Sequence, residues 1–145
     1  MHIKTTPTQN NTIDALEADY LYVKTSQIHE AGNGLYTAID IYKDEIISIF
    51  KGEILDASEA ASRVQQNLDR YFINLLDGRI MDSMHTDCFA KYANDSKGKN
   101  NSPLKNNAKI GLDDDGNVCI IATKQIVSGE EIFCGYGKQY WKKHR

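Results

Sequence analysis

Two Asp-Gly steps, each placed between short apolar runs, constrain the fold of this chain more than any other feature. The first is Asp77-Gly78, and the second lies in the polar stretch Asp113–Asn117. Asp-Gly adopts the backbone of a tight hairpin turn, so each step predicts two antiparallel strands. The expected strands are 70–76 and 79–82 around the first step, 109–112 and 118–122 around the second, and 20–24 and 46–50 elsewhere. The pattern predicts a mostly β protein with few short helices.

One stretch predicts a helix. Asp56 is a favourable N-cap residue, and Glu59, three positions later, can bond back to the backbone of the cap and complete a capping box. Apolar residues then recur at helical spacing on one face: Ala57, Ala60, Ala61, Val64 and Leu68. Because most of them are small, we expect this face to pack closely on the sheet rather than to form a ligand groove.

Length and charge limit the domain organisation and the partners. A chain of 145 residues forms one domain; the polar composition of 1–19 predicts a flexible N-terminal segment, and 20–145 is the expected domain. The net charge of −3 disfavours nucleic acid and better suits a cationic peptide. No apolar run approaches the roughly 18 residues of a membrane span, and the N-terminus has no apolar leader. We therefore expect an intracellular protein that binds no membrane.

The metal-binding residue types do not cluster. The three cysteines, Cys88, Cys119 and Cys134, and the four histidines are dispersed without ligand spacing, which predicts free thiols in a reducing compartment and no zinc site. The acidic run Asp113–Asp115 resembles part of a calcium loop, but the remaining ligand positions are missing. A solvated hairpin tip is the favoured interpretation.

The stretch 129–141 combines features that a plain strand does not need. A turn at Ser128-Gly129 precedes a short apolar strand, and two glycines, Gly135 and Gly137, then flank Tyr136. Glycine weakens a strand because it costs backbone entropy and offers no side chain for packing. The spacing indicates close backbone approach beside a fixed phenol, although a glycine-rich strand end is the simpler alternative. Likewise, Gly32-Asn33-Gly34 alone indicates only a turn, and it lacks the third glycine of a dinucleotide site.

Four short segments are informative when their order and spacing are considered together. They are Ala31–Tyr36, with its Gly-x-Gly; Phe50–Glu53, close to Tyr-x-Gly; Lys91–Ser96, close to Arg-Phe-Ile-Asn-His-Ser; and Glu131–Gly137, close to Glu-Leu-x-(Phe/Tyr)-Asp-Tyr-Gly. Each motif is loose, but their order and spacing between residues 20 and 141 resemble the SET-domain family of protein-lysine methyltransferases.

The resemblance implies a fold, a reaction and a site. The fold is the SET-domain β-clip of small curved sheets with a C-terminal pseudoknot. The implied cofactor is S-adenosyl-L-methionine, the substrate is a lysine-containing protein or peptide such as a histone tail, and the location is the nucleus or the cytoplasm. Tyr136 is the implied catalytic residue, and no metal is required. Implied cofactor-binding residues are Gly32, Asn33, Gly34, Tyr71, Asn94, Asp95 and Trp141, and implied substrate-channel residues are Phe50, Tyr71 and Cys134.

The chain also departs from the family pattern. Asp95 replaces a histidine that helps to fix the catalytic tyrosine, Gly135 replaces the acidic residue beside that tyrosine, and Lys91 replaces an arginine. The cysteines of the zinc-bound cap of many relatives are missing, and Trp141 could cover the cofactor instead or simply pack. The rival hypotheses are a SET-like interaction module without catalysis and a small β protein without a cofactor. Methyl transfer separates the first rival from an enzyme, and cofactor binding separates the second.

Overall fold

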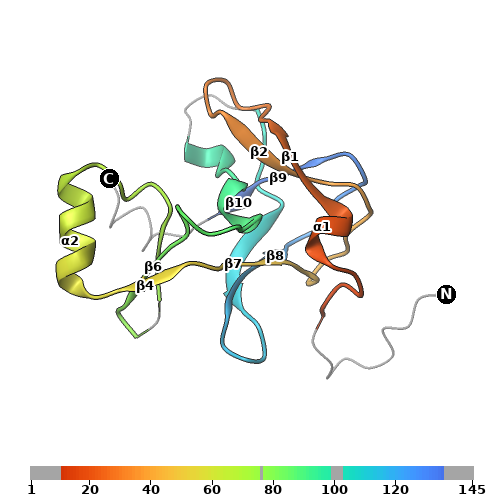
Figure 1. The fold of residues 1–145 in the computed structure, drawn as a ribbon. Helices are drawn as coiled ribbons and strands as arrows, with labels where there is room; N and C mark the ends of the chain where they lie inside the picture. Colours follow the sequence, from red (N-terminus) through yellow and green to blue (C-terminus); the bar gives the residue numbers. More distant parts are fainter. Residues whose placement is uncertain (1–10, 76, 99–102, 136–145) are drawn as a thin grey trace.

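The computed structural model describes residues 11–75, 77–98 and 103–135, which form three small sheets and a few short helices (Figure 1). The helices are α1 (Glu17–Tyr20), α2 (Ala57–Gln65), and the 3-10 turns η1 (Ala90–Tyr92) and η2 (Ser96–Gly98). The strands are β1 (Leu21–Thr25), β2 (Asn33–Thr37), β3 (Ile46–Ile49), β4 (Glu53–Leu55), β5 (Phe72–Asn74), β6 (Ile80–Asp82), β7 (Ala108–Leu112), β8 (Val118–Ala122), β9 (Glu131–Ile132) and β10 (Cys134–Gly135). The predicted mostly β fold is confirmed.

The sheets have the strand orders β1-β2-β9, β10-β7-β8-β3 and β4-β6-β5. Both predicted hairpins are present, because β5 pairs with β6 and β7 pairs with β8 in antiparallel register. Their turns contain Gly78 and Gly116 at φ values of 89° and 82°, a region that glycine adopts without steric cost. Within the described residues, no helix is long and apolar enough to cross a membrane.

The last described strands make two parallel contacts that hairpins cannot produce. Cys134 in β10 pairs with Ala108 in β7, and Phe133 forms an isolated parallel bridge with Asn94. The chain from 133 to 135 therefore lies between two earlier segments. A segment that lies between two earlier segments in this way indicates a threaded chain, an arrangement that is rare in proteins.

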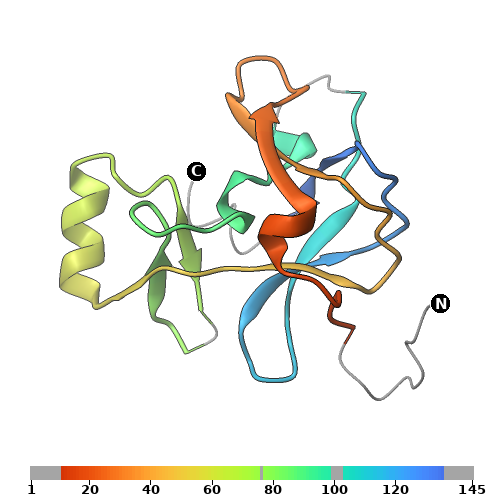
Figure 2. The same cartoon turned by 45° about the vertical axis from the view of Figure 1, so that its right-hand side comes forward.

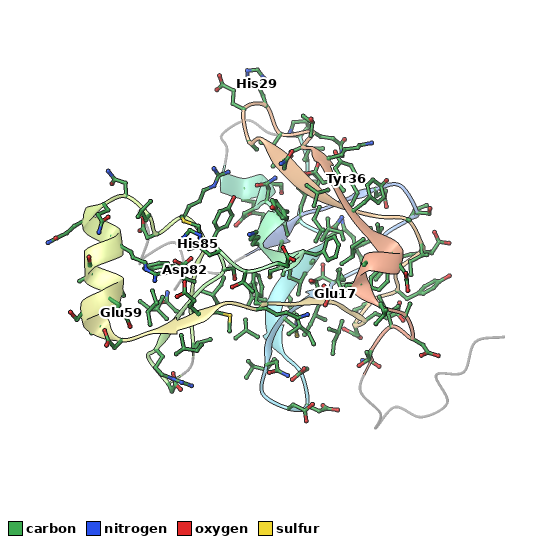
Figure 3. The ribbon with its side chains drawn as sticks, viewed as in Figure 1. Glu17, His29, Tyr36, Glu59, Asp82 and His85 are labelled. Atoms are coloured by element: carbon green, nitrogen blue, oxygen red, sulfur yellow. The ribbon has the colours of Figure 1, made fainter. Side chains whose placement is uncertain are left out.

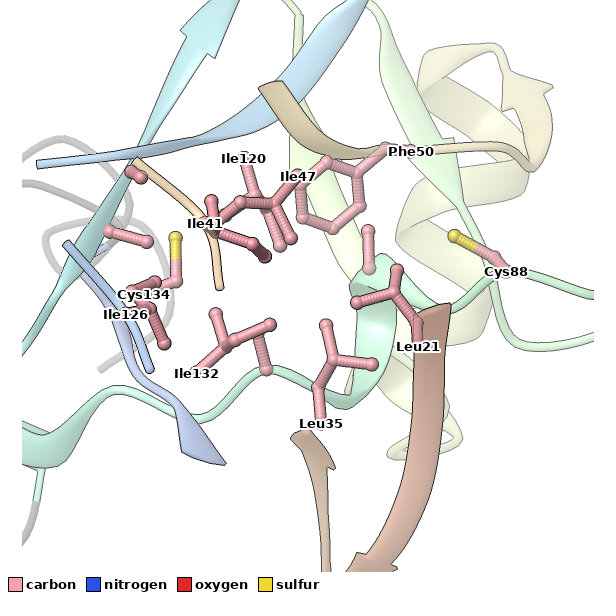
Figure 4. Packing of buried hydrophobic residues seen from close by; sticks show 14 of the residues in the cluster. Leu21, Leu35, Ile41, Ile47, Phe50, Cys88, Ile120, Ile126, Ile132 and Cys134 are labelled. Atoms are coloured by element: carbon pink, nitrogen blue, oxygen red, sulfur yellow. The ribbon is translucent and has the colours of Figure 1, made fainter. Parts of the chain in front are cut away.

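The main core lies between the first two sheets. Figure 4 shows Leu35 and Ile132 of one sheet facing Ile47 and Ile120 of the other, and all four side chains are fully buried. Burial of such side chains is the principal source of folding free energy. The core consequently fixes β9 and the start of β10 from both sides.

The segment 11–20 covers the edge of β3. The amide of Ile46 donates to the carbonyl of Asn11 at 2.9 Å, and the Glu17 carboxylate accepts from the backbone amide of Ile49 at 3.0 Å. The hydroxyl of Tyr20 donates to the carbonyl of Ile47 at 2.7 Å, and burial raises the pKa of this phenol. These bonds occupy backbone groups of an edge strand that would otherwise be open to pairing. The expected division at residue 19 stays a prediction.

The α2 helix begins as predicted but does not pack as predicted. The Glu59 amide donates to the Asp56 carboxylate at 2.8 Å, and both halves of the capping box are present. Only Ala60 of the apolar face is buried, however, against Leu55 and Phe72. The other four members, Ala57, Ala61, Val64 and Leu68, are exposed. In Figures 1 and 2, α2 stands at one end of the molecule beside three very short strands, so little sheet surface is available to cover its face.

Ion pairs add to the small apolar contact of Ala60 in holding α2 against its sheet. The Arg63 guanidinium donates to the fully buried Asp82 carboxylate at 2.7 Å and to the exposed Glu53 at 3.0 Å. Figure 3 shows Asp82 on the side of its strand that faces the helix. The Asp82 carboxylate also accepts from the amide of Met84 at 3.0 Å. The pairing lowers the pKa of Glu53, because Arg63 favours its ionised form.

We expect Arg63→Ala to lower the midpoint of thermal unfolding by several degrees, because it leaves the Asp82 carboxylate buried without its counter-ion. Arg79→Ala is the matched control: Arg79 pairs with Asp77 at 2.7 Å, but both side chains are more than half exposed, and such surface pairs contribute little to stability. Differential scanning calorimetry measures both midpoints. Equal shifts in the two variants would contradict the role of Arg63.

Candidate functional site

Asn94 joins three of the four motif segments. Its side-chain amide donates to the carbonyl of Asn33 at 3.0 Å, and its own carbonyl accepts from the amide of Cys134 at 2.8 Å. The bridge with Phe133 runs alongside. The Gly-x-Gly turn, the Asn segment and the strand that leads to Tyr136 therefore meet at one residue.

The turn between β1 and β2 presents backbone at its surface. The amide of Ser26 donates to the carbonyl of Gly32 at 2.8 Å, and the amide of Ala31 donates to the carbonyl of Ile28 at 3.1 Å. These two bonds close the turn. Gly32 has φ of 77°, and nothing lies within 4 Å of where its Cβ would stand. Gly32 and Asn33 are exposed. A ligand can thus approach this backbone closely, which a side chain at Gly32 would hinder.

Asn107 holds the end of β9 through its side chain. Its amide nitrogen donates to the carbonyl of Glu131 at 3.0 Å, and its amide oxygen accepts from the backbone of Phe133 at 2.8 Å. Its backbone amide donates to the Phe133 carbonyl at 2.9 Å. The Asn107 side chain thus replaces the peptide group that a neighbouring strand would supply, and it satisfies buried backbone groups.

Asn106 connects the polar loop to β10. Its Oδ1 accepts from the backbone amide and the hydroxyl of Ser96 at 2.9 and 2.8 Å, and its Nδ2 donates to the Asp95 carboxylate at 2.9 Å. The same carboxylate accepts from the amide of Lys97 at 2.9 Å. A Cβ on Gly135 would lie 3.1 Å from Asn106 Nδ2. Asp95 and Gly135, which both differ from the family pattern, therefore have Asn106 as a common neighbour.

This arrangement predicts that restoring the acidic residue at position 135 alone is harmful. Gly135→Asp adds a side chain against Asn106 and a second carboxylate near Asp95, so we expect the free energy of unfolding to fall by about 1–3 kcal/mol. Gly135→Ala adds only the Cβ and is expected to cost less. In an Asp95→Asn background, part of the loss should return. Urea unfolding measures the parent, both variants at position 135, Asp95→Asn and the double variant, and an unchanged Gly135→Asp variant would contradict the packing argument.

Tyr71 lies between two cations. Its ring is 5.3 Å from the Arg70 guanidinium and 5.4 Å from the Lys91 ammonium. The Lys91 ammonium donates to the carbonyls of Ser83, Met84 and Thr86 at 3.1, 3.3 and 3.2 Å. Three converging carbonyls suit the three donors of a compact ammonium, so a planar guanidinium is not required here.

The predicted channel residues differ in exposure. Phe50 is 4% exposed and Cys134 is fully buried, both in the main core, whereas Tyr71 is half-buried. Burial strongly raises the pKa of the Cys134 thiol, which therefore stays protonated and behaves as a small apolar side chain. Tyr136 and Trp141 lie outside the described residues.

Sequence reasoning assigned no function to Asn106, Asn107 or Glu131. The available signals were two adjacent asparagines directly before an apolar strand and an acidic residue inside an apolar run. Both patterns indicate polar side chains that the fold buries with partners. The described residues contain no group of three or more His, Cys, Asp and Glu side chains placed to hold a metal ion.

A separate groove of about 740 Å³ lies between the 12–20 segment, β3 and residues 87–92. Its lining includes Leu16, Ile49 and Phe89. None of the residues predicted for the cofactor or the channel lines it, so it is distinct from the junction at Asn94.

Comparisons with known proteins identify the same family that the order of the motifs indicates. The family model for the SET domain matches residues 32–137, well over half of the chain. A solved structure, described as a humanized mutant of the Chaetomium thermophilum Polycomb Repressive Complex 2 bound to the inhibitor GSK343, superposes with a TM-score of 0.67 at 23% identity. The match covers 81% of this chain and 15% of the other, so it speaks for the fold alone. No curated protein sequence matches the chain.

Proposed function

The chain belongs to the SET-domain family, which comprises protein-lysine methyltransferases, and we propose from this premise that it transfers a methyl group from S-adenosyl-L-methionine to a lysine side chain of a protein. The observation that carries the proposal is the junction at Asn94. One side chain and one carbonyl of this residue connect the exposed Gly32-Asn33 turn to the strand that precedes Tyr136. A cofactor held at the turn would thus lie close to the strand that leads to the proposed catalytic tyrosine.

The described residues fit the polar end of such a cofactor. The Asn94 Oδ1 atom accepts no hydrogen bond from the described residues and can therefore accept one from an ammonium group. Gly32 and Asn33 are exposed, and the absence of a side chain at Gly32 leaves room for a ligand beside this backbone, whose two carbonyls already accept from Ser26 and Asn94. We propose that Gly32, Asn33, Gly34, Asn94 and Asp95 hold the cofactor, with Tyr71 and Trp141 beside it. When bound, S-adenosylmethionine supplies a methyl group on a positively charged sulfur.

The protein must also present a neutral amine. A lysine has a pKa of about 10.4, so its deprotonation at pH 7 costs about 4.6 kcal/mol. An apolar channel lowers this pKa because it disfavours the charged form. We propose that Phe50, Cys134 and Tyr71 supply the channel wall and exclude water, and that the Tyr136 hydroxyl orients the reacting groups. The net charge of −3 suits a lysine-rich partner such as a histone tail, in the nucleus or the cytoplasm.

The rival function is a SET-like interaction module that binds partners without catalysis. The replacements Asp95 and Gly135 favour it, because they alter the surroundings of the proposed catalytic tyrosine. The hydrogen bond from Asn106 Nδ2 to the Asp95 carboxylate gives that replacement a defined place in the fold, which suits either function. Transfer of a methyl group distinguishes the two functions.

The test incubates the protein with radiolabelled S-adenosylmethionine and a mixture of histones and cell extract. We expect label on lysine, identified by mass spectrometry of the labelled band. Cofactor binding without label on any protein would favour the interaction module. Absence of both binding and label would contradict the proposed function and leave the assignment to the family unaffected.

A further inference from the structure

Glu131 is a buried acid that the proposed reaction does not use. Glu131 is 1% exposed, and its carboxylate accepts from the Ser26 hydroxyl at 2.6 Å and the Gln27 amide at 2.8 Å. The Tyr36 hydroxyl lies 3.2 Å from the same carboxylate and makes its shorter bond, 2.7 Å, to the carbonyl of Thr25. Ser26, Gln27 and Tyr36 belong to β2 or to the turn before it. One side chain of β9 is therefore bound to the turn that carries Gly32 and Asn33.

The Glu131 carboxylate occupies the space where a side chain at Gly34 would begin. A Cβ on Gly34 would lie 2.2 Å from Glu131 Oε2 and 2.9 Å from its Cδ, distances that real atoms do not adopt. The backbone of Gly34 needs no positive φ, and the residue is buried. The second glycine of the Gly-x-Gly motif thus makes room for Glu131, whereas the first is glycine because of its positive φ.

Two further sets of hydrogen bonds connect Glu131 to the proposed cofactor site, the first through Ser26 and the second through Asn33. The Ser26 hydroxyl that donates to Glu131 also accepts from the amide of Ile28, and the Ser26 amide closes the turn on Gly32. The next residue, Asn33, accepts from Asn94. Release of Ser26 would therefore loosen the turn at the point where Asn94 is attached.

Stability alone does not account for this acid. A buried carboxylate is costly unless hydrogen bonds satisfy it, and an apolar side chain would fill the same space without that cost. What the carboxylate adds is a unique position for two donors on one turn, the Ser26 hydroxyl and the Gln27 amide. A buried polar group with satisfied partners specifies one arrangement over others.

We infer that Glu131 is a positioning residue that fixes the 26–33 turn for cofactor binding, and that Gly34 is glycine to admit its carboxylate. The part concerning the cofactor rests on the proposed function. The fixing of the turn does not, because it follows from the contacts alone.

The first test replaces Glu131 with Gln, which keeps size and removes charge. Hydrogen bonds to a charged acceptor are the stronger kind, so we expect the Kd and KM for S-adenosylmethionine to rise about tenfold to a hundredfold. The kcat at saturating cofactor should change little, which separates positioning from catalysis. Glu130→Gln is the matched control, since Glu130 is the exposed neighbour and, among the described residues, its carboxylate accepts only from the amide of Val127. It should leave Kd, KM and kcat unchanged.

Hydrogen exchange of the cofactor-free protein provides a readout that does not depend on activity. Amides of the 26–33 turn should exchange about tenfold faster in Glu131→Gln, while amides of the β7–β8 hairpin keep their parent rates. If the parent binds no S-adenosylmethionine, the proposed function fails, and the exchange rates still decide the role of Glu131. Parent-like exchange in Glu131→Gln overturns the inference even if the cofactor binds.

The role of Gly34 needs a double-mutant cycle. Gly34→Ala alone should displace the carboxylate, speed exchange in the turn and weaken cofactor binding as much as Glu131→Gln does. In a Glu131→Ala background, the added methyl group meets no carboxylate and keeps only the tight contact with Ser26 Cα at 3.2 Å, so the same substitution should cost less. Equal effects of Gly34→Ala in both backgrounds would show that the glycine does not serve Glu131.

Discussion

Replacement of Asn94 with Ala is expected to abolish most S-adenosylmethionine binding and to leave the fold intact. Within the described part of the chain, the side chain makes one hydrogen bond, to the carbonyl of Asn33, whereas the contacts with Phe133 and Cys134 use the backbone and survive the substitution. At a cofactor concentration 100 times its Kd, binding stabilises the parent by about 2.7 kcal/mol. For a chain of this length, that raises the melting temperature by roughly 5 to 10 °C. The variant should show a small fraction of this shift.

Two further variants make the result specific. Asn117→Ala is the matched control, because the side-chain amide of Asn117 likewise donates one hydrogen bond to a described residue, Asp113, at 3.0 Å in the exposed tip of the β7–β8 hairpin. It should keep the parent's shift. Asn94→Asp keeps the shape of the side chain but turns a carboxylate toward the Asn33 carbonyl, and it should bind as poorly as Asn94→Ala. Isothermal titration calorimetry measures all three, and full binding by Asn94→Ala would remove the basis of the site.

The parts of the fold that the sequence predicted are those whose causes lie within a few residues. Asp77-Gly78 and the Asp113–Asn117 stretch determine their hairpins because the turn backbone depends on the turn residues themselves. The capping box of α2 depends on two residues that are three positions apart. Such features follow from local chemistry alone.

The site could not be predicted in the same way, because its contacts join distant segments. Asn94 and Asn33 are 61 residues apart, and Ser26 and Glu131 are 105 apart. No periodicity or turn rule relates residues at these separations. The exposed face of α2 was missed for a related reason, since its burial depends on the size of a sheet that the helix sequence does not encode.

The resemblance supplied what local rules could not. It assigned Asn94 and Gly32 to one site before any contact was known, and the structure brings both segments together. It gave no reason for Gly34 beyond its place in a motif. The contact with Glu131 supplies that reason from packing.

Tyr136→Phe is expected to bind S-adenosylmethionine like the parent and to lose methyl transfer. The substitution removes one hydroxyl and keeps the ring, so its effect on packing is small. A hydroxyl that orients the reacting groups contributes through alignment, and misalignment of about 1 Å can cost a hundredfold in rate. We therefore expect the kcat to fall about a hundredfold or more, with the Kd for the cofactor nearly unchanged.

Two variants with opposite expected defects, one in cofactor binding and one in turnover, make this prediction specific. Asn94→Ala should lose binding, whereas Tyr136→Phe should keep binding and lose turnover, and a protein that is merely destabilised would lose both. Tyr42→Phe is the matched control, because it removes the same hydroxyl from a tyrosine that is 54% exposed. It should keep both binding and turnover. Single-turnover kinetics with one accepted peptide measure the chemical step directly, and equal rates for parent and Tyr136→Phe would assign the catalytic role to another residue.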